Sequence, residues 1–167
     1  AKALDVIVGA GTGEGLTPTG EKMRRLMHYG QMFQSHALHF FHLVSPDLLF
    51  GIDGDPAIRN VIGVALMHKD LAVQGVMMRK YGQEIIRATA GKKIHGTGAS
   101  PGGINRHLDP AEKESFLNGP DPLNIDQMIT WAQGALDFFK GYYKENKQFI
   151  DTFAEFPSNH LSLVRKD

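Results

Sequence analysis

Apolar positions along the chain recur mainly at helical spacing, and this pattern predicts a mostly helical protein. Residues 17–43 carry methionine, leucine and phenylalanine side chains spaced for one face of a long helix. Thr17 followed by Pro18 is typical of a helix start, because a hydroxyl caps the first turn and proline fits its first position. Pro46 is expected to end this helix, since proline lacks the backbone N–H that a helix interior needs.

Two further long helices are predicted downstream. One begins at residue 69 or 70 and ends at Ala90, where Gly91 provides the stop. The other begins at Asn124, with Gln127 in the reciprocal capping position, and carries an apolar stripe at helical spacing. We expect it to extend to about Phe153.

Shorter signals fill the remaining segments. Asp55 and Asp109 are each followed by proline, a pattern that predicts two more helix starts, and Glu112 completes a capping box at the second. Gly119, between asparagine and proline, is expected to end the helix that follows Asp109. The mainly apolar residues 161–165 predict a short strand.

The predicted fold class is mainly α, with long antiparallel helices, glycine-rich loops and little sheet. Both ends look cut, because residues 1–8 have helical apolar content without a cap and the terminal strand has no partner. We therefore expect residues 1–167 to be a single internal segment of a longer chain.

The glycine-rich stretch at 91–105 is the most informative local feature. It holds five glycines, one proline and one histidine, and it has no helical or strand period. So many residues that tolerate unusual backbone geometry indicate a fixed, close-packed path rather than a flexible linker. We expect the pair Ile94 and His95 to be buried within it.

A second glycine-rich segment, residues 6–13, has the composition of a dinucleotide-binding loop. Glu14 stands where the third glycine of that motif belongs, and no strand follows about thirty residues later to complete the unit. A connector between two helices is the favoured interpretation.

Four histidines lie on about a third of the circumference of the first long helix: His28, His36, His39 and His42. They could form a metal site or a proton relay, or they could be hydrogen-bonded core residues. No carboxylate lies on the same stretch, so a supporting role near a metal is favoured over direct binding. The stretch 26–46 carries no charged residue, but its histidines, glutamines and serines favour burial in protein over a membrane span.

Composition removes several functional classes. The 18 basic and 18 acidic residues of the 167-residue chain cancel, so nothing favours binding to nucleic acid or to an anionic membrane. The chain contains no cysteine. Disulfides, thiolate metal sites and cysteine nucleophiles are therefore excluded within it.

Taken together, residues 35–43, 91–95 and 101–103 resemble, in this order, the large subunit of nickel–iron hydrogenases. Segments 17–25 and 82–86 continue the resemblance, which is closest to the cytoplasmic, bidirectional branch coupled to pyridine nucleotides. The resemblance implies a parent enzyme that oxidises H2 reversibly and a larger α+β subunit of which this mainly α chain is part. It also implies a nickel–iron centre held by two Cys-x-x-Cys motifs, with this chain between them and no metal ligand within it. The isolated chain is therefore expected to be inactive.

The resemblance implies roles for two groups of residues. Ser35, His36 and His39 are expected near the metals without binding them or acting as catalytic groups. Ser35 takes the position of an aspartate in the membrane-bound uptake enzymes, so a proton role based on that carboxylate is in doubt.

His95 and the motif Pro101, Gly102 and Gly103 are expected to face an iron–sulfur cluster of the small subunit. The small subunit, with its clusters, is the implied partner, and diaphorase subunits are further partners implied by the branch. The implied location is the cytoplasm.

Two alternatives remain at this stage. One is the hydrogenase-related scaffold subunit of the quinone site in respiratory complex I, which lacks the metal cysteines. The other is a non-enzymatic, histidine-rich helical binding module. Sequence on either side of the chain separates them, because paired Cys-x-x-Cys motifs favour a hydrogenase and their replacement favours the complex I relative.

Overall fold

A computed structural model describes residues 3–7, 15–152 and 155–164. The chain divides into two compact units, residues 1–132 and residues 133–167. The described residues are mostly helical, with a single two-stranded sheet among them, which confirms the predicted mainly α class. Residues 3–7 are helical, whereas most of the glycine-rich segment at 6–13 lies outside the described residues.

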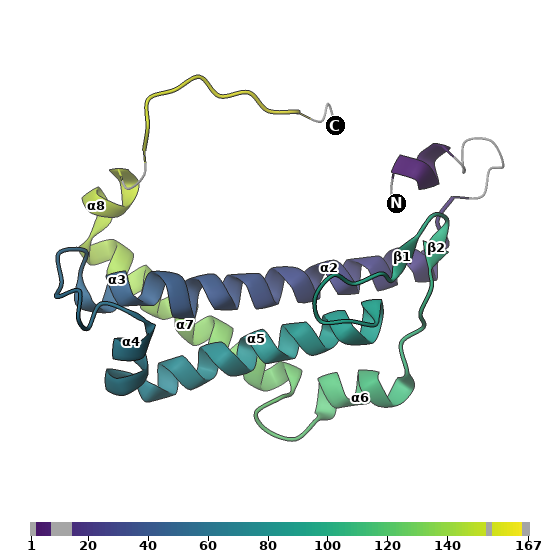
Figure 1. Cartoon of the computed structure of the whole chain (residues 1–167), viewed down its shortest axis with the longest axis horizontal. Coiled ribbons are helices and arrows are strands. Elements are labelled where there is room, and N and C mark those ends of the chain that lie inside the picture. The colour runs from purple at the N-terminus through teal and green to yellow at the C-terminus, as the bar shows by residue number, and fades with distance from the viewer. Residues whose placement is uncertain (1–2, 8–14, 153–154, 165–167) are drawn as a thin grey trace. The chain divides into compact units, whose positions relative to one another are not determined.

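Two long antiparallel helices, α2 (Pro18–Leu38) and α5 (Lys69–Ala90), form the centre of the first unit (Figure 1). The predicted start of α2 is confirmed, because the Thr17 hydroxyl accepts a hydrogen bond from the backbone N–H of Gly20. The predicted end of α5 is also confirmed. Gly91 follows it in the left-handed conformation, with φ at 80°, which glycine adopts without steric cost.

Two glycines let α2 and α5 approach with their backbones nearly in contact. A Cβ on Gly82 would lie 2.7 Å from the carbonyl oxygen of Gly30 and 2.8 Å from the backbone nitrogen of Gln34. Ordinary contacts begin at about 3.4 Å, so no larger side chain fits at this crossing without moving a helix.

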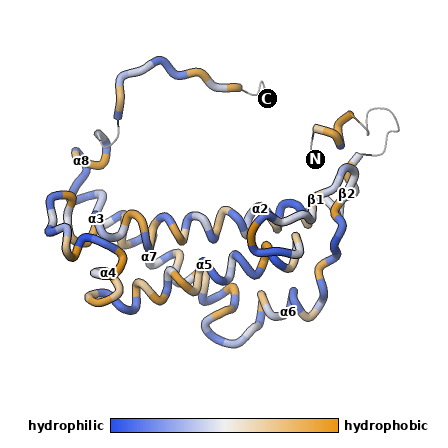
Figure 2. Tube along the Cα trace, in the orientation of Figure 1, coloured by the Kyte–Doolittle hydropathy of each residue, from blue (hydrophilic) through white to orange (hydrophobic). Residues whose placement is uncertain are grey.

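The apolar core lies along the α2–α5 contact and is closed by neighbouring elements. Hydrophobic and hydrophilic residues are interspersed along both helices (Figure 2), as expected when one face of each helix packs in the core and the other faces solvent. The segments that join the two helices contribute the fully buried side chains of Phe41 and Val64. The start of α7 (Ile125–Glu145) contributes the fully buried side chain of Met128. Met23, Met78, Tyr81 and Ile85 complete the buried contacts along the two helices.

Pro46 does not end the first helix, contrary to the prediction. The chain passes from α2 into a π-helix, η1 (His39–Val44), and then directly into α3 (Ser45–Phe50). Pro46 lies in the first turn of α3. A first-turn residue has no helical acceptor for its N–H, so proline is tolerated there.

The helix start predicted at Asp55 is also wrong. Its carboxylate accepts from the N–H of Ala57, which forms a turn, and the next helix, α4 (Val61–Met67), begins six residues later. The cap of α4 is Asn60, whose side chain accepts from the N–H groups of Ile62 and Gly63.

The glycine-rich stretch after α5 forms a short hairpin of β1 (Ala99–Ser100) and β2 (Gly103–Ile104), so it is not entirely without strands. The helix α6 (Pro110–Asn118) follows, with Asp109 as its cap and Gly119 after its end, as predicted. Glu112 does not complete the predicted capping box there, because its carboxylate pairs with Arg87 and Arg106 instead.

The helix α7 starts as predicted, since the Asn124 side chain accepts from the N–H of Gln127. It stops at Glu145, and a separate short helix, α8 (Lys147–Thr152), follows. The predicted C-terminal strand is wrong for residues 161–164, which have no regular structure and are almost fully exposed. A strand needs a hydrogen-bonding neighbour, and these described residues have none.

Within the described part of the chain, no single helix is long and apolar enough to cross a membrane. The helices α4 and α5 reach that length and hydropathy only as a pair, and the chain bends by 120° between them.

Candidate functional site

Arg24, one turn and a half into α2, holds the Pro-Gly-Gly hairpin in place. Its guanidinium donates to the carbonyl oxygen of Gly103 at 2.7 and 3.0 Å and to the carbonyl oxygen of Ser100. The same guanidinium forms an ion pair with the carboxylate of Asp5, which in turn accepts from the N–H of Gly102. We call Asp5 and Arg24 the hairpin clamp.

The electrostatics of the clamp are mutually supporting. Asp5 is buried, and hydrogen bonds from Arg24 and from the Gly102 amide lower the pKa of its carboxyl below the ordinary value, outweighing the opposing effect of burial. The carboxylate therefore stays charged, and the hairpin is fixed by a side chain almost one hundred residues away in sequence.

Backbone contacts fix the rest of the glycine-rich stretch, which supports the prediction of a fixed path. The N–H of Thr97 donates to the carbonyl of Ala90, and the N–H of Asn105 donates to the carbonyl of Gly98. Gly98 is buried, and a Cβ there would lie 2.6 Å from the carbonyl oxygen of Thr89. This is a second close approach that only glycine allows.

The predicted burial of Ile94 and His95 is wrong for this chain. Ile94 is 63% exposed, and His95 is also exposed. His95 adopts a φ of 53°, the only positive φ among the described non-glycine residues. A non-glycine residue in this conformation is strained by about 1 kcal/mol or more, so the surrounding loop imposes the position of the imidazole.

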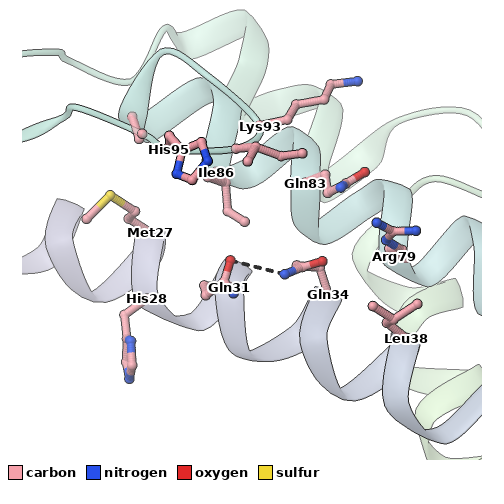
Figure 3. A pocket seen from close by; sticks show the side chains of 13 residues that line it. Met27, His28, Gln31, Gln34, Leu38, Arg79, Gln83, Ile86, Lys93 and His95 are labelled. Atoms are coloured by element: carbon pink, nitrogen blue, oxygen red, sulfur yellow. Dashed lines mark hydrogen bonds between the residues drawn. The ribbon is translucent and has the colours of Figure 1, made fainter. Parts of the chain in front are cut away.

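A groove of about 560 Å³ runs between α2, α5 and the loop that carries His95 (Figure 3). Arg79 and Gln83 on α5 face Gln34 and Leu38 on α2 across it. The amide of Gln34 donates to the side chain of Gln31 at 3.1 Å. The full lining is Met27, His28, Gln31, Gln34, Leu38, Arg79, Gln83, Ile86, Ala90, Lys93, Ile94, His95 and Gly96.

Ser35, His36 and His39 do not line this groove, although Gln34 and Leu38 beside them in the sequence do. Arg24 and Ser35 are eleven residues apart, which is roughly 16 Å along a helix. All three residues are exposed in this chain, and the His36 ring bonds the carbonyl of Met32 at 2.8 Å. Arg24 holds the hairpin that carries Gly102 and Gly103, so the structure separates that hairpin from Ser35 along α2.

The π-helix η1 begins at His39, the last of these three exposed residues. The N–H of His39 is shared between the carbonyls of Ser35 and His36, and the register then widens through Val44. Single π-turns are frequent at functional sites. His42, in η1, is partly buried, and its Nδ1 atom has no hydrogen-bond partner among the described residues.

Burial lowers the pKa of His42, and the nearby positive charge of Arg79 lowers it further. The imidazole is therefore neutral at neutral pH. Arg79 itself has a buried Nε atom without a hydrogen-bond partner.

Sequence reasoning missed three residues of this region: Asp5, Arg24 and Arg79. Asp5 had a weak signal, because it is the single charge among the apolar residues at 3–8. Arg24 and Arg79 had none, since each is an ordinary charged position on a long helix and its partners come from distant segments.

Across the described ranges, no three His, Asp or Glu side chains converge as a metal site would require. Together with the lack of cysteine in the sequence, this gives no donor set of the kind that thiolate-bound nickel needs.

The known proteins that resemble this chain over almost its whole length are subunits of hydrogenases. The β subunit of the NAD-reducing hydrogenase HoxS from Cupriavidus necator is 47% identical over 170 residues, which cover 100% of this chain and 35% of that subunit. One subunit of the F420-non-reducing hydrogenase vhu from Methanocaldococcus jannaschii is 37% identical over 98% of this chain and 37% of its own length. No family model matches the chain.

The fold has a solved counterpart. A crystal structure of an NAD+-reducing nickel–iron hydrogenase in the H2-reduced state is 48% identical and superposes with a TM-score of 0.82. The match covers 93% of this chain and 33% of that one. The chain thus spans about a third of the length of the relatives that it matches.

Proposed function

The chain is a homologue of one segment of the nickel–iron hydrogenase large subunit, and we propose that its parent protein oxidises H2 reversibly to protons and electrons. The observation that supports this proposal is the combination of 47% identity over the whole chain with a matching fold. The relatives' names supply the reaction class, and the proposal transfers it to the parent of this chain. The role of residues 1–167 in that enzyme is to build part of the scaffold between the two Cys-x-x-Cys motifs.

The residues of this chain do not fit the nickel–iron centre, so no step of the reaction is assigned to them at the metals. The donors that the family uses are thiolates, and the sequence has none. We propose that the metal ligands lie outside this segment. Ser35, His36 and His39, exposed here, are then available to be covered by other parts of the large subunit near the metals.

The hairpin clamp and the strained His95 suggest how the scaffold serves electron transfer. The loop that carries His95 is closed by the hydrogen bond from the Thr97 N–H to the Ala90 carbonyl, and Arg24 holds the hairpin that follows it. We propose that this imidazole, with Pro101, Gly102 and Gly103 behind it, faces an iron–sulfur cluster of the small subunit. A hydrogen-bond donor beside a cluster stabilises its more negative, reduced state.

The proposed partners are the small subunit and, by analogy with the NAD-reducing relative, diaphorase subunits that pass electrons to a pyridine nucleotide. The cytoplasm is the compartment that we propose, because an enzyme coupled to NAD works where that nucleotide is available.

The test uses the assembled, metal-loaded enzyme with His95→Ala and compares two activities. Hydrogen–deuterium exchange needs only the nickel–iron centre, whereas H2-driven reduction of an acceptor also needs the clusters. We expect the variant to slow acceptor reduction and to leave exchange largely intact. An equal loss of both activities in a fully assembled variant would show that His95 supports the active-site scaffold rather than the electron path.

A further inference from the structure

Arg79 differs from the other arginines of the described chain in having no acidic partner. Arg24 pairs with Asp5, Arg25 with Glu21 and Arg59 with Asp47. Arg87 and Arg106 both pair with Glu112. Arg79 forms no ion pair with any carboxylate of residues 3–7, 15–152 or 155–164, and its Nε atom is buried without a hydrogen bond.

The surroundings of Arg79 make this lack of a partner costly. A guanidinium carries five N–H donors and stays charged, and the buried Nε atom of Arg79 has lost hydration that no acceptor of the described residues replaces. His42, which senses the charge of Arg79, is an imidazole and supplies no negative charge. An anion that accepts hydrogen bonds from the guanidinium would replace part of this lost hydration.

The groove beside Arg79 is built for such an anion. Its lining contains no acidic residue, and it holds Arg79 together with the side-chain amides of Gln34 and Gln83 (Figure 3). Lys93, the other permanent cation of the lining, is already paired with Glu84 at 2.5 Å. The positive charge without an acidic partner is therefore concentrated on Arg79, whose planar guanidinium suits a carboxylate.

We propose that this groove receives an aspartate or glutamate side chain of the small subunit, with Arg79 as its ion-pair partner and Gln34 and Gln83 as flanking hydrogen-bond donors. The choice of the small subunit rests on the proposed function, because His95 lines the same groove and is the residue assigned to that interface. The carboxylate would complete the hydrogen bonding of Arg79 only when the two subunits associate.

A carbodiimide cross-link tests both the chemistry and the source of the carboxylate. Arg79→Lys in the assembled enzyme places a primary amine in the groove, and carbodiimide joins an amine only to a carboxylate in contact with it. We expect a single amide link from position 79 to an acidic residue of the small subunit, identified by mass spectrometry of the digested complex. A link to another part of the large subunit, or no link at all, overturns the proposal. Lys80, the exposed neighbour on α5, serves as the internal control for unspecific surface coupling.

The affinity between the two subunits provides a second measurement. Arg79→Gln should weaken binding of the small subunit at least about tenfold, because truncating one partner of a desolvated charge pair leaves the other unpaired. Lys80→Gln should leave the affinity unchanged. Equal affinities of the two variants would contradict the proposal.

These outcomes are separable from failure of the proposed function. A wild-type assembly that binds its small subunit but shows no hydrogen–deuterium exchange refutes the hydrogenase assignment. In that case the cross-link and affinity results still test whether Arg79 pairs with a carboxylate of the small subunit.

Discussion

The glycine at the crossing of α2 and α5 provides a sharp test of the packing described above. Replacing Gly82 with alanine adds one Cβ, 2.7 Å from the carbonyl oxygen of Gly30 and 2.8 Å from the backbone nitrogen of Gln34. Both obstacles are backbone atoms of a long helix, so no side-chain rotation relieves the contact. The two helices must separate by about 0.7 Å to bring the shorter of these contacts to the 3.4 Å of an ordinary contact.

The expected cost follows from two opposing effects. Overpacking a tight contact destabilises by about 1–3 kcal/mol, and backbone obstacles place this case near the upper end. Alanine gains about 1 kcal/mol over glycine in helix propensity. The net prediction for Gly82→Ala is a loss of about 1–2 kcal/mol in the free energy of unfolding.

Gly134 in α7 provides the matched control, because a Cβ there meets no atom within 4 Å. Gly134→Ala should stabilise by up to about 1 kcal/mol through propensity alone. Urea denaturation of the 167-residue chain, followed by circular dichroism at 222 nm, measures both variants. If Gly82→Ala is as stable as Gly134→Ala, α2 and α5 are not in backbone contact and the packing argument is refuted.

Three further outcomes follow from the clamp, from α6 and from the loop. Because Arg24 and the Gly102 amide lower the pKa of Asp5, the clamp contributes fully above about pH 4 and is lost as the pH falls through the lowered pKa. The NMR shift of the Gly102 amide should therefore be constant from pH 7 to about 4 and change only below, and a transition near pH 6 would be inconsistent with this. Tyr81→Phe removes a 2.8 Å hydrogen bond to the carbonyl of Phe116 and should cost about 1 kcal/mol in urea denaturation, an effect absent if the bond does not form. At His95, where φ is 53°, glycine should be about 1 kcal/mol more stable than alanine in thermal unfolding, and equal stabilities would rule out the left-handed conformation.

Local signals in the sequence predicted the elements whose ends depend on neighbouring residues. The end of α5 at Gly91, the caps of α2 at Thr17 and of α6 at Asp109, and the start of α7 at Asn124 were all correct. In each case, a side chain or a glycine next to the helix end satisfies the terminal backbone groups. Such information is contained within four residues of sequence.

Other features depended on contacts that no local pattern contains. Pro46 was tolerated because the π-turns of η1 shift the helix register before it, and Asp55 bonded its own turn instead of a helix. Residues 161–164 had the pattern of a strand but lacked a neighbour to pair with among the described residues. The candidate site shows the same limit. The motif 101–103 was identified by resemblance, whereas its clamp joins Arg24 to residues 76 and 79 positions away.

The amino-acid composition of the chain likewise gave no indication of the positive charge in the groove. Acidic and basic residues balance over the whole chain, yet Arg79 has no acidic partner in the folded, described part of it. Only the placement of α2 against α5 shows that this arginine faces two glutamine amides and no carboxylate.

The most direct test of the central claim is hydrogen–deuterium exchange by the parent large subunit, purified with its small subunit and loaded with metal. The account predicts that the assembly forms HD from D2 and water, because the chain is 47% identical over its whole length to a subunit of an NAD-reducing hydrogenase. An assembled, metal-loaded enzyme that forms no HD would contradict it.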